Sequence, residues 1–143
     1  MLGRVFNRSI ACALILGCLG SLAEAAHEPS VSSPNDSPRI STDAFLDSPF
    51  TRYYKTQDYP NALKALDALL KTYPDDPLIL RYRARVLARL GRTKEAITLY
   101  RRLVSEDPQH APTRIFLGEA YLRSGQSEAA AEQWRWVLQH SDS

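Results

Sequence analysis

Residues 57–66 read QDYPNALKAL, residues 91–100 read GRTKEAITLY, and residues 125–134 read GQSEAAAEQW. The stretches follow one another at 34 positions, and in each an alanine is followed four positions later by a large apolar residue. The alanines are Ala62, Ala96 and Ala130, and the large residues are Leu66, Tyr100 and Trp134. A fixed period of this length is typical of a stacked helical array, a class that holds partners more often than it does chemistry.

Turn and cap signals recur with the same period. Gly91 and Gly125 stand where a first helix must turn back, and glycine tolerates the left-handed backbone that such a turn needs. Thr93 and Ser127 follow two positions later and are expected to cap the second helices. In the first unit, Asp58 is the expected cap.

The helical pattern begins near Asp43 and divides the repeat domain, residues 43–143, into three units: residues 43–76, 77–110 and 111–143. Each is expected to fold as helix, turn, helix. Pro77 and Pro112 suit the first turn of a helix. Because Pro49 would break a full-length first helix in the first unit, that helix is expected to begin near Ser48 and Pro49.

The units resemble the tetratricopeptide repeat, which has 34 residues with Leu-Gly, Tyr, Ala, an aromatic residue and a closing Pro at set spacings. The third unit is the most similar, through Leu117, Gly118, Tyr121, Ala130 and Trp134. The second departs at Arg83, where the family has a buried leucine. The resemblance covers about 100 residues. It implies an all-α fold, an α-solenoid of three helix-turn-helix units in which each unit buries its apolar face against its neighbours.

The first 25 residues have the features of a signal peptide. Arg4 and Arg8 make the start positive, residues 10–22 carry no charge and are mostly apolar, and small residues at Ala23 and Ala25 predict cleavage after Ala25. The apolar run is shorter than the roughly 20 residues of a membrane-spanning helix, which favours a cleaved signal peptide over the alternative, an uncleaved N-terminal anchor.

Cys18 opens another route to the cell envelope. Residues 15–18, Ile-Leu-Gly-Cys, resemble a bacterial lipobox, in which the cysteine is lipidated and becomes the first mature residue. Both routes predict an exported protein of the periplasm or cell envelope, or a secreted one. Cys12 also lies in this segment, so the mature chain would have no disulfide and no cysteine metal ligand.

Residues 26–42 are predicted to be a disordered linker. Residues 27–40 contain three prolines and four serines and almost no apolar side chains, which leaves too little to bury. This linker is a tether with reach or a simple spacer. The whole chain has 143 residues, 24% of them charged, and a net charge of +2, which favours one soluble-type domain and no particular partner.

An arginine stripe is the strongest candidate for partner binding. Arg81, Arg85 and Arg89 are four residues apart and share one helix face, although like charges at this spacing repel by roughly 0.2–0.5 kcal/mol a pair. In tetratricopeptide repeats the first helices line a concave groove, and the resemblance adds to it Tyr54, Lys55, Tyr82, Phe116, Glu119 and Arg123. A basic groove with aromatic neighbours would suit an extended acidic peptide or a terminal carboxylate. The alternative is a solvated charged face.

The sequence lacks the residues with which one class of these grooves binds a C-terminal carboxylate. Some repeats clamp the C-termini of cytosolic chaperones with Lys, Asn and Arg, whereas those positions here hold Asp47, Thr51, Tyr82, Pro112 and Phe116. A second surface is expected near Trp136, which we predict to be exposed at the C-terminal edge and to suit a partner or self-association. Alternatively, Trp136 folds back onto its own repeat.

No catalytic constellation stands out. His27, His110 and His140 are far apart without a metal-type spacing, and no serine lies beside a base that would activate it. We therefore predict neither enzyme activity, nor a metal, nor a cofactor. The predicted function is a non-catalytic protein-interaction module of the bacterial periplasm or envelope. The alternative is a lipoprotein that assembles an envelope, pilus or secretion machine. Nucleic-acid binding is disfavoured by export and by the near-neutral charge.

Overall fold

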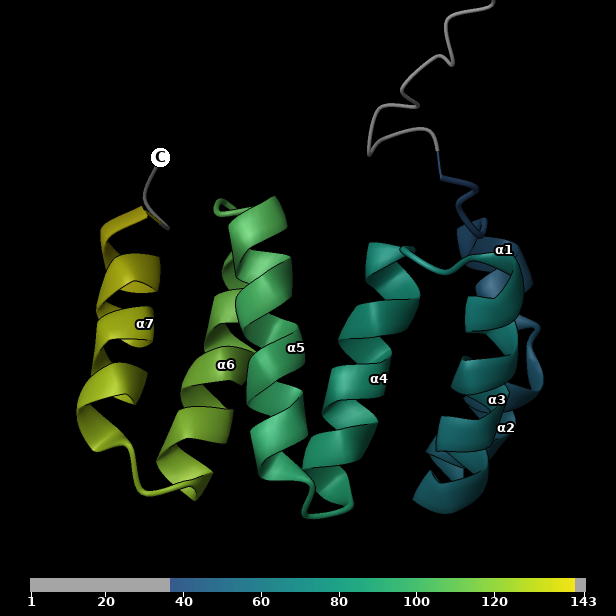
Figure 1. Cartoon of the computed structure of the whole chain (residues 1–143), viewed down its shortest axis with the longest axis horizontal. Coiled ribbons are helices and arrows are strands. Elements are labelled where there is room, and N and C mark those ends of the chain that lie inside the picture. The colour runs from purple at the N-terminus through teal and green to yellow at the C-terminus, as the bar shows by residue number, and fades with distance from the viewer. Residues whose placement is uncertain (1–36, 141–143) are drawn as a thin grey trace, which may run out of the picture. The chain divides into compact units, whose positions relative to one another are not determined.

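The computed structural model of the chain describes residues 37–140. The predicted signal peptide (1–25), Cys18 and most of the predicted linker lie outside these residues. Within them the regular elements are helices: α1 (Thr42–Leu46), α2 (Pro49–Lys55), α3 (Tyr59–Thr72), α4 (Pro77–Arg89), α5 (Thr93–Glu106), α6 (Ala111–Arg123) and α7 (Ser127–His140) (Figure 1). The predicted all-α fold is confirmed.

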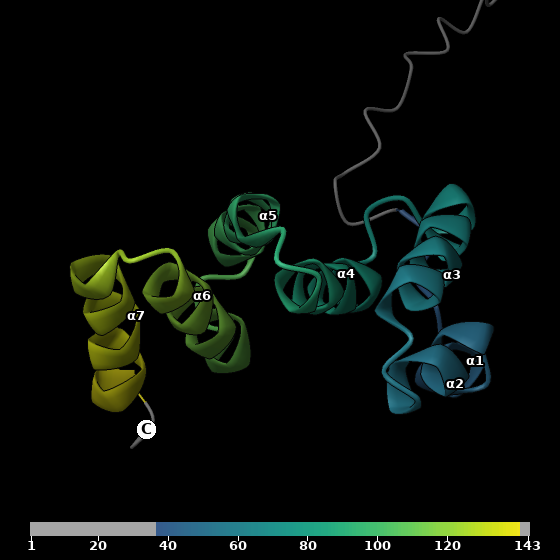
Figure 2. The ribbon, with the colours of Figure 1, turned by 90° about the horizontal axis from the view of Figure 1, so that it is seen from below.

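Each helix packs against the next one along the chain, and α4 also contacts α6. Helices α2 and α3, α4 and α5, and α6 and α7 therefore form three successive pairs, and Figures 1 and 2 show these pairs following one another in chain order. This is the arrangement of an α-solenoid, in which a repeat contacts only its neighbours. The contact between α4 and α6 sets the first helices of two repeats side by side.

Pro49 divides the first helix of the first repeat. As predicted, a helix begins there: α2 starts at Pro49 with Ser48 as its N-cap residue, and the short helix α1 precedes it. A proline cannot donate to the carbonyl four residues earlier, here that of Phe45. That carbonyl instead accepts from the Ser48 hydroxyl at 2.6 Å and the Ser48 amide at 3.2 Å. The bend between α1 and α2 follows from these contacts.

The turns within the repeats use the left-handed backbone. Gly91 and Gly125 have φ values of 78° and 79°, as their position in the repeat predicts. Gln57 stands at the equivalent point of the first repeat and has φ 60° without being a glycine. The first repeat therefore keeps the same turn geometry, although the left-handed backbone is strained for a residue with a Cβ atom.

The expected caps of the second helices are partly wrong. Asp58 caps α3, and its side chain accepts from the Asn61 amide at 3.3 Å. Helices α5 and α7 begin at Thr93 and Ser127 themselves, so these residues lie inside the first turn instead of before it. The N-cap residue of α5 is Arg92, whose guanidinium spans the first turn to the carboxylate of Glu95 with two contacts of 2.6 Å. This pair joins two side chains, and no side chain caps the backbone amides at the start of α5.

Two clusters of buried side chains form the core, and α4 contributes to both. Ile79 and Val86 of α4 pack with the first repeat, whereas Leu80, Ala84 and Leu87 pack with α5 and α6. The three repeat-defining alanines, Ala62, Ala96 and Ala130, are fully buried, so the helices of each pair approach closely. Burial on two faces makes α4 the helix that couples the first repeat to the rest of the array.

Trp134 packs inside the third repeat, against Gly118 of α6. A Cβ atom at Gly118 would lie 2.3 Å from the indole nitrogen of Trp134, so only glycine leaves room for this ring. The same nitrogen donates to the carbonyl of Ile115 at 3.3 Å. Gly118, in the Leu-Gly pair of α6, thus leaves the space that the Trp134 ring of α7 fills.

The last residues of the predicted linker contact the repeat domain. The Ile40 amide donates to a carboxylate oxygen of Asp76 at 2.9 Å, and the Ile40 side chain packs against the core cluster of the first repeat. Ser41 then caps α1. Asp76 is buried and holds residues 37–41 against the start of α4, an interaction that composition alone does not reveal.

No helix within residues 37–140 combines the length and the apolar character that a bilayer crossing requires.

Candidate partner-binding groove

Arg85 lies at the centre of an aromatic cluster that draws on three repeats. Its guanidinium carbon is 4.5 Å from the centroid of the Phe116 ring, 5.3 Å from that of Tyr82 and 5.6 Å from that of Tyr54. These rings come from α6, α4 and α2, the first helices of their repeats. Each such contact contributes about 0.5–1 kcal/mol when exposed and about 2 kcal/mol when desolvated. The cluster therefore holds the guanidinium in a defined place.

The aromatic rings also join α2 to α4. The centroids of Phe50 and Tyr82 are 5.2 Å apart, those of Tyr54 and Tyr82 5.8 Å, and those of Phe45 and Tyr82 5.1 Å. Such tilted and edge-to-face pairs are favourable beyond their buried area. The rings around Arg85 are thus continuous with the packed core through Phe45 and Phe50.

A small hollow of about 30 Å³ adjoins Arg85 between α4 and α6. Its lining includes Arg89, Phe116, Glu119 and Arg123. Arg123 donates to the Ala88 carbonyl on α4 at 3.2 Å, which fixes its guanidinium beside the hollow. Three arginines against one glutamate give this part of the surface a positive balance that would attract carboxylates.

Tyr100 lies beneath this hollow and is a residue that sequence reasoning assigned only to the core. Its ring stacks on Phe116 with centroids 6.3 Å apart, and the side chain is buried. Burial raises the pKa of the Tyr100 hydroxyl, and the nearby Arg85 opposes this shift. The hydroxyl therefore stays protonated at neutral pH and supports the groove as a neutral group.

The structure separates two of the nine groove residues from this cluster. Arg81 lines a different cavity, at the start of α4, so the arginine stripe is split between two places. Lys55 lines a hollow with Leu46 and Asp47 beside α1 and α2. The remaining seven gather around Arg85 or line the hollow beside it: Tyr54, Tyr82, Arg85, Arg89, Phe116, Glu119 and Arg123.

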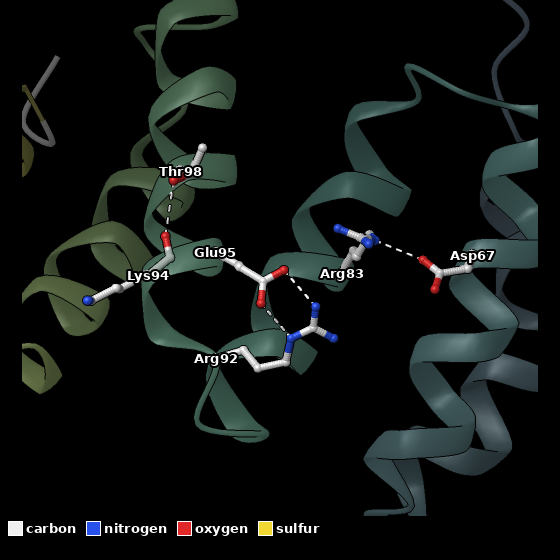
Figure 3. A network of polar contacts seen from close by, with 6 residues as sticks. All are labelled: Asp67, Arg83, Arg92, Lys94, Glu95 and Thr98. Carbon is white, nitrogen blue, oxygen red and sulfur yellow. Dashed lines mark hydrogen bonds and ion pairs between the residues drawn. The ribbon is translucent and has the colours of Figure 1, made fainter.

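The basic stretch of α4 and α5 contains arginines of two kinds. Figure 3 shows Arg83 reaching from α4 to Asp67 on α3, at 2.9 Å, and Arg92 paired with Glu95. Arg83 thus replaces the leucine of the family with a bridge between repeats. The stripe residues Arg81, Arg85 and Arg89, in contrast, make no ion pair with any residue in the range 37–140. No carboxylate within residues 37–140 lies at ion-pair distance from these three guanidinium groups.

Trp136 is partly buried and follows the folded-back alternative. The guanidinium carbon of Arg114 lies 4.0 Å from its ring centroid, and the His140 ring stacks on it at 4.2 Å. Both neighbours belong to the third repeat. The neighbouring Leu138 is 72% exposed, so the apolar surface at this edge centres on Leu138 and not on the tryptophan that the sequence suggested.

The described part of the chain gathers no three or more His, Cys, Asp or Glu side chains in an arrangement that would hold a metal ion. His110 caps α6 instead, because its Nδ1 accepts from the Thr113 amide at 3.2 Å. Burial, and then the charge of Arg81, lower the pKa of His110.

Comparison with known proteins agrees with the fold. Tetratricopeptide repeat models match residues 50–111 and 111–136. A surface lipoprotein assembly modifier of Pasteurella multocida is 32% identical over 78 residues, which are 52% of this chain and 15% of that protein. Tetratricopeptide repeat protein 8 of Caenorhabditis elegans is 29% identical over 134 residues, 93% of this chain and 25% of that protein. The chain spans a quarter or less of the length of these relatives.

Two solved structures show similar helix arrangements. The type III secretion translocator chaperone SycD of Yersinia enterocolitica has a TM-score of 0.62 at 20% identity, over 71% of this chain and 77% of SycD. The TPR2B domain of yeast Sti1, in a complex with pHsp70, has a TM-score of 0.58 at 26% identity, over 64% of this chain and 73% of that domain. Together with the 34-residue period, the three helix pairs and the matched models, these similarities show that the chain belongs to the tetratricopeptide repeat family.

Proposed function

We propose that this chain is a non-catalytic protein-interaction module that holds an extended, acidic segment of a partner protein against Arg85. The observation that carries the proposal is the state of this arginine. It is partly buried, it lies against three aromatic rings, and it makes no ion pair within residues 37–140. A planar guanidinium that is already held in place loses little entropy when it binds a carboxylate with two hydrogen bonds.

Two further features support a binding role. Arg89 and Arg123 lie beside the same hollow and would favour further acidic residues of the partner. The Sti1 domain, which is similar in fold and 26% identical, was solved in a complex with pHsp70. The chaperone clamp residues are replaced in this chain, so we expect recognition through the aromatic and arginine groups instead.

The test uses a fluorescein-labelled peptide with two glutamates in a Gly-Ser background and its glutamine counterpart. We expect Arg85→Glu to weaken binding of the acidic peptide at least tenfold in fluorescence polarisation, and added salt to weaken binding to the wild-type protein. The matched control is Arg101→Glu, which makes the same charge change on an exposed residue of α5. Equal loss in both variants, or no loss in either, would overturn the proposed groove.

We also propose that the chain is exported and acts at the bacterial cell envelope. Residues 1–25 would be the signal peptide, and the repeats would follow a short linker. The similarity to a surface lipoprotein assembly modifier over 78 residues favours an envelope role, including the lipoprotein alternative in which Cys18 is lipidated.

Intact mass of the protein recovered from bacterial envelope and periplasmic fractions separates these alternatives. Cleavage after Ala25 predicts an unmodified mature chain in the periplasm. Lipidation predicts a heavier chain that begins at Cys18, remains with membranes and reverts in a Cys18→Ala variant. A full-length chain confined to the cytoplasm would contradict export.

A further inference from the structure

A second cavity lies where α4 and α6 begin and α5 ends. Its volume is about 570 Å³, within the range of about 300–1,000 Å³ that ligand pockets have. Arg81 and Pro77 line it from α4, Leu103 from α5, and His110 and Thr113 from the start of α6. The lining includes the end of a second helix, so this site is not part of the surface formed by first helices alone.

Most charged groups of this cavity are already satisfied. Arg102 donates to Asp75 and to Glu106, each at 2.7 Å, so these three side chains neutralise one another in part. The Nδ1 of His110 is held by the Thr113 amide at 3.2 Å and lies 2.7 Å from the Thr113 hydroxyl. These groups form the walls of the cavity and offer little to a ligand.

Arg81 is different. It forms no hydrogen bond or ion pair with the residues of the range 37–140, yet it is partly buried. Burial lowers the pKa of its guanidinium, although the charges of Asp76 and Asp107 oppose this shift, so the group has lost hydration without a hydrogen bond to replace it. A buried guanidinium in this state gains most from an anion that restores its hydrogen bonds.

We propose that this cavity is a carboxylate subsite, in which Arg81 binds a second acidic group of the segment held by Arg85, two residues away along the peptide. The inference deepens the proposed function and rests on it for the peptide, whereas the subsite itself rests on the cavity and on Arg81. The carboxylate is that of an acidic side chain or of a chain terminus.

The spacing follows from helix and strand geometry. Arg81 and Arg85 are four residues apart on α4, which is about 6 Å along the helix axis. In an extended peptide, residues i and i+2 point to the same side and are about 6.6 Å apart. Adjacent acidic residues point to opposite sides and cannot engage both arginines in this way. The groove should therefore prefer Glu-x-Glu to Glu-Glu.

The lining also bears on which anion fits. Asp75, Glu106 and Asp107 line the cavity together with three arginines, Arg39, Arg81 and Arg102. Because these charges balance, the cavity has no excess of positive charge that would favour a doubly charged anion over a single carboxylate. Pro77 and Leu103 provide apolar surface for the methylene groups of a glutamate. A carboxylate on an aliphatic stem fits this lining best.

The test compares amidated, fluorescein-labelled peptides of equal charge that contain Glu-Ser-Glu or Glu-Glu-Ser in the same Gly-Ser background. We expect the wild-type protein to bind Glu-Ser-Glu at least fivefold more tightly. Arg81→Gln should abolish this preference and leave the affinity for a Glu-Ser-Gln amide unchanged, while Arg101→Gln, the matched control, should retain the preference. A peptide that ends in Glu-Ser-Gln with a free carboxylate distinguishes a chain terminus from a side chain.

Equal binding of the two spacings by the wild-type protein, or a preference that survives Arg81→Gln, would overturn the subsite while the proposed groove stands. If binding ignores Arg85 instead, the proposed function fails. The subsite is then tested by itself, through the NMR signal of the Arg81 Nε–H group. A saturable shift with N-acetylglutamate, absent with N-acetylglutamine amide, supports the subsite, and no shift overturns it.

Discussion

At the scale of single residues, Gln57 adopts a backbone conformation that is less stable for it than for the glycines at the same position of the other two repeats. Its φ of 60° lies in the left-handed region, where Gly91 and Gly125 have φ values of 78° and 79°. A residue with a Cβ atom is less stable there by about 1–2 kcal/mol, whereas glycine adopts this conformation freely. The turn is kept because it aligns α2 with α3, which pack on each other.

We expect Gln57→Gly to raise the free energy of unfolding by about 0.5–1 kcal/mol, since relief of backbone strain exceeds the added entropy of the unfolded chain. Urea unfolding followed by circular dichroism measures the change. The control is Gly125→Ala, at which a Cβ atom would meet nothing within 4 Å, so a loss of similar size would come from the backbone alone. A lower stability of Gln57→Gly would contradict the argument.

His110 makes the start of α6 sensitive to pH. Its Nδ1 can accept from the Thr113 amide only while it is unprotonated. Burial, the main cause, and Arg81 lower the pKa of His110 in the fold below the ordinary value of 6.5 that the unfolded chain keeps, although Asp107 opposes this. The unfolded chain therefore binds more protons, and this part of the stability is present above pH 6.5 and is lost as the pH falls below it.

We expect His110→Asn, which keeps a capping acceptor that does not titrate, to lose less stability than the wild type between pH 7.5 and pH 5.5. Urea unfolding at several pH values gives the free energy of unfolding of each protein. In the difference between the two proteins, the contributions of the carboxylates that both share cancel. Parallel curves for the two proteins would show that His110 does not control this dependence.

At the scale of elements, a single carboxylate at the start of α4 accepts hydrogen bonds from three backbone amides. The buried Asp76 carboxylate accepts from Leu78 at 2.8 Å and Ile79 at 3.1 Å, and its other oxygen accepts from Ile40 at 2.9 Å. One side chain thus caps the helix that joins the two core clusters and also fastens residues 37–41 to the first repeat. Charged acceptors form stronger hydrogen bonds than neutral ones.

Removing this carboxylate should be costly. We expect Asp76→Ala to lower the free energy of unfolding by about 2–3 kcal/mol, since three backbone donors lose a charged acceptor. Asp58→Ala is the matched control, because Asp58 caps α3 but is only partly buried, and it should lower the stability by about 1 kcal/mol. Equal losses in chemical unfolding would show that the tie to Ile40 contributes nothing.

At the scale of the molecule, stability is distributed along the array. The first repeat meets α4 through the rings of Phe45, Phe50, Tyr54 and Tyr82, and the third repeat meets α4 and α5 through a different set of buried residues. In such arrays a repeat depends on its neighbours and not on distant units. Local damage at one end should therefore remain local at first.

We expect Phe50→Ala to destabilise the protein by about 3–4 kcal/mol, because a fully buried ring is removed. Hydrogen exchange should rise in α1, α2 and α3, while α6 and α7 keep most of their protection. Mass spectrometry of pepsin fragments measures both regions in one sample. A uniform rise across all helices would mean that the chain unfolds as a single cooperative unit.

The sequence predicts the fold well where a residue acts through its own backbone or its nearest helix partner. The left-handed glycines and the helix start at Pro49 are local in this sense. The expected caps at Thr93 and Ser127 lie one residue too late, because both helices already begin at these residues, and helix ends shift by a residue without changing the periodic pattern. The bond between Ile40 and Asp76 could not be predicted, because the two residues lie more than thirty positions apart in the sequence.

By itself, the sequence determined the period, the pairing of helices and the presence of an arginine stripe on one helix face, since all of these follow from spacings within a few turns of helix. Only the tertiary structure decided how that charge is used. It set Arg85 among rings from three repeats and Arg81 in a separate cavity, and it paired Arg83 with Asp67. Residues four apart share a helix face, but their surroundings depend on which neighbouring helix reaches them, and packing alone settles that.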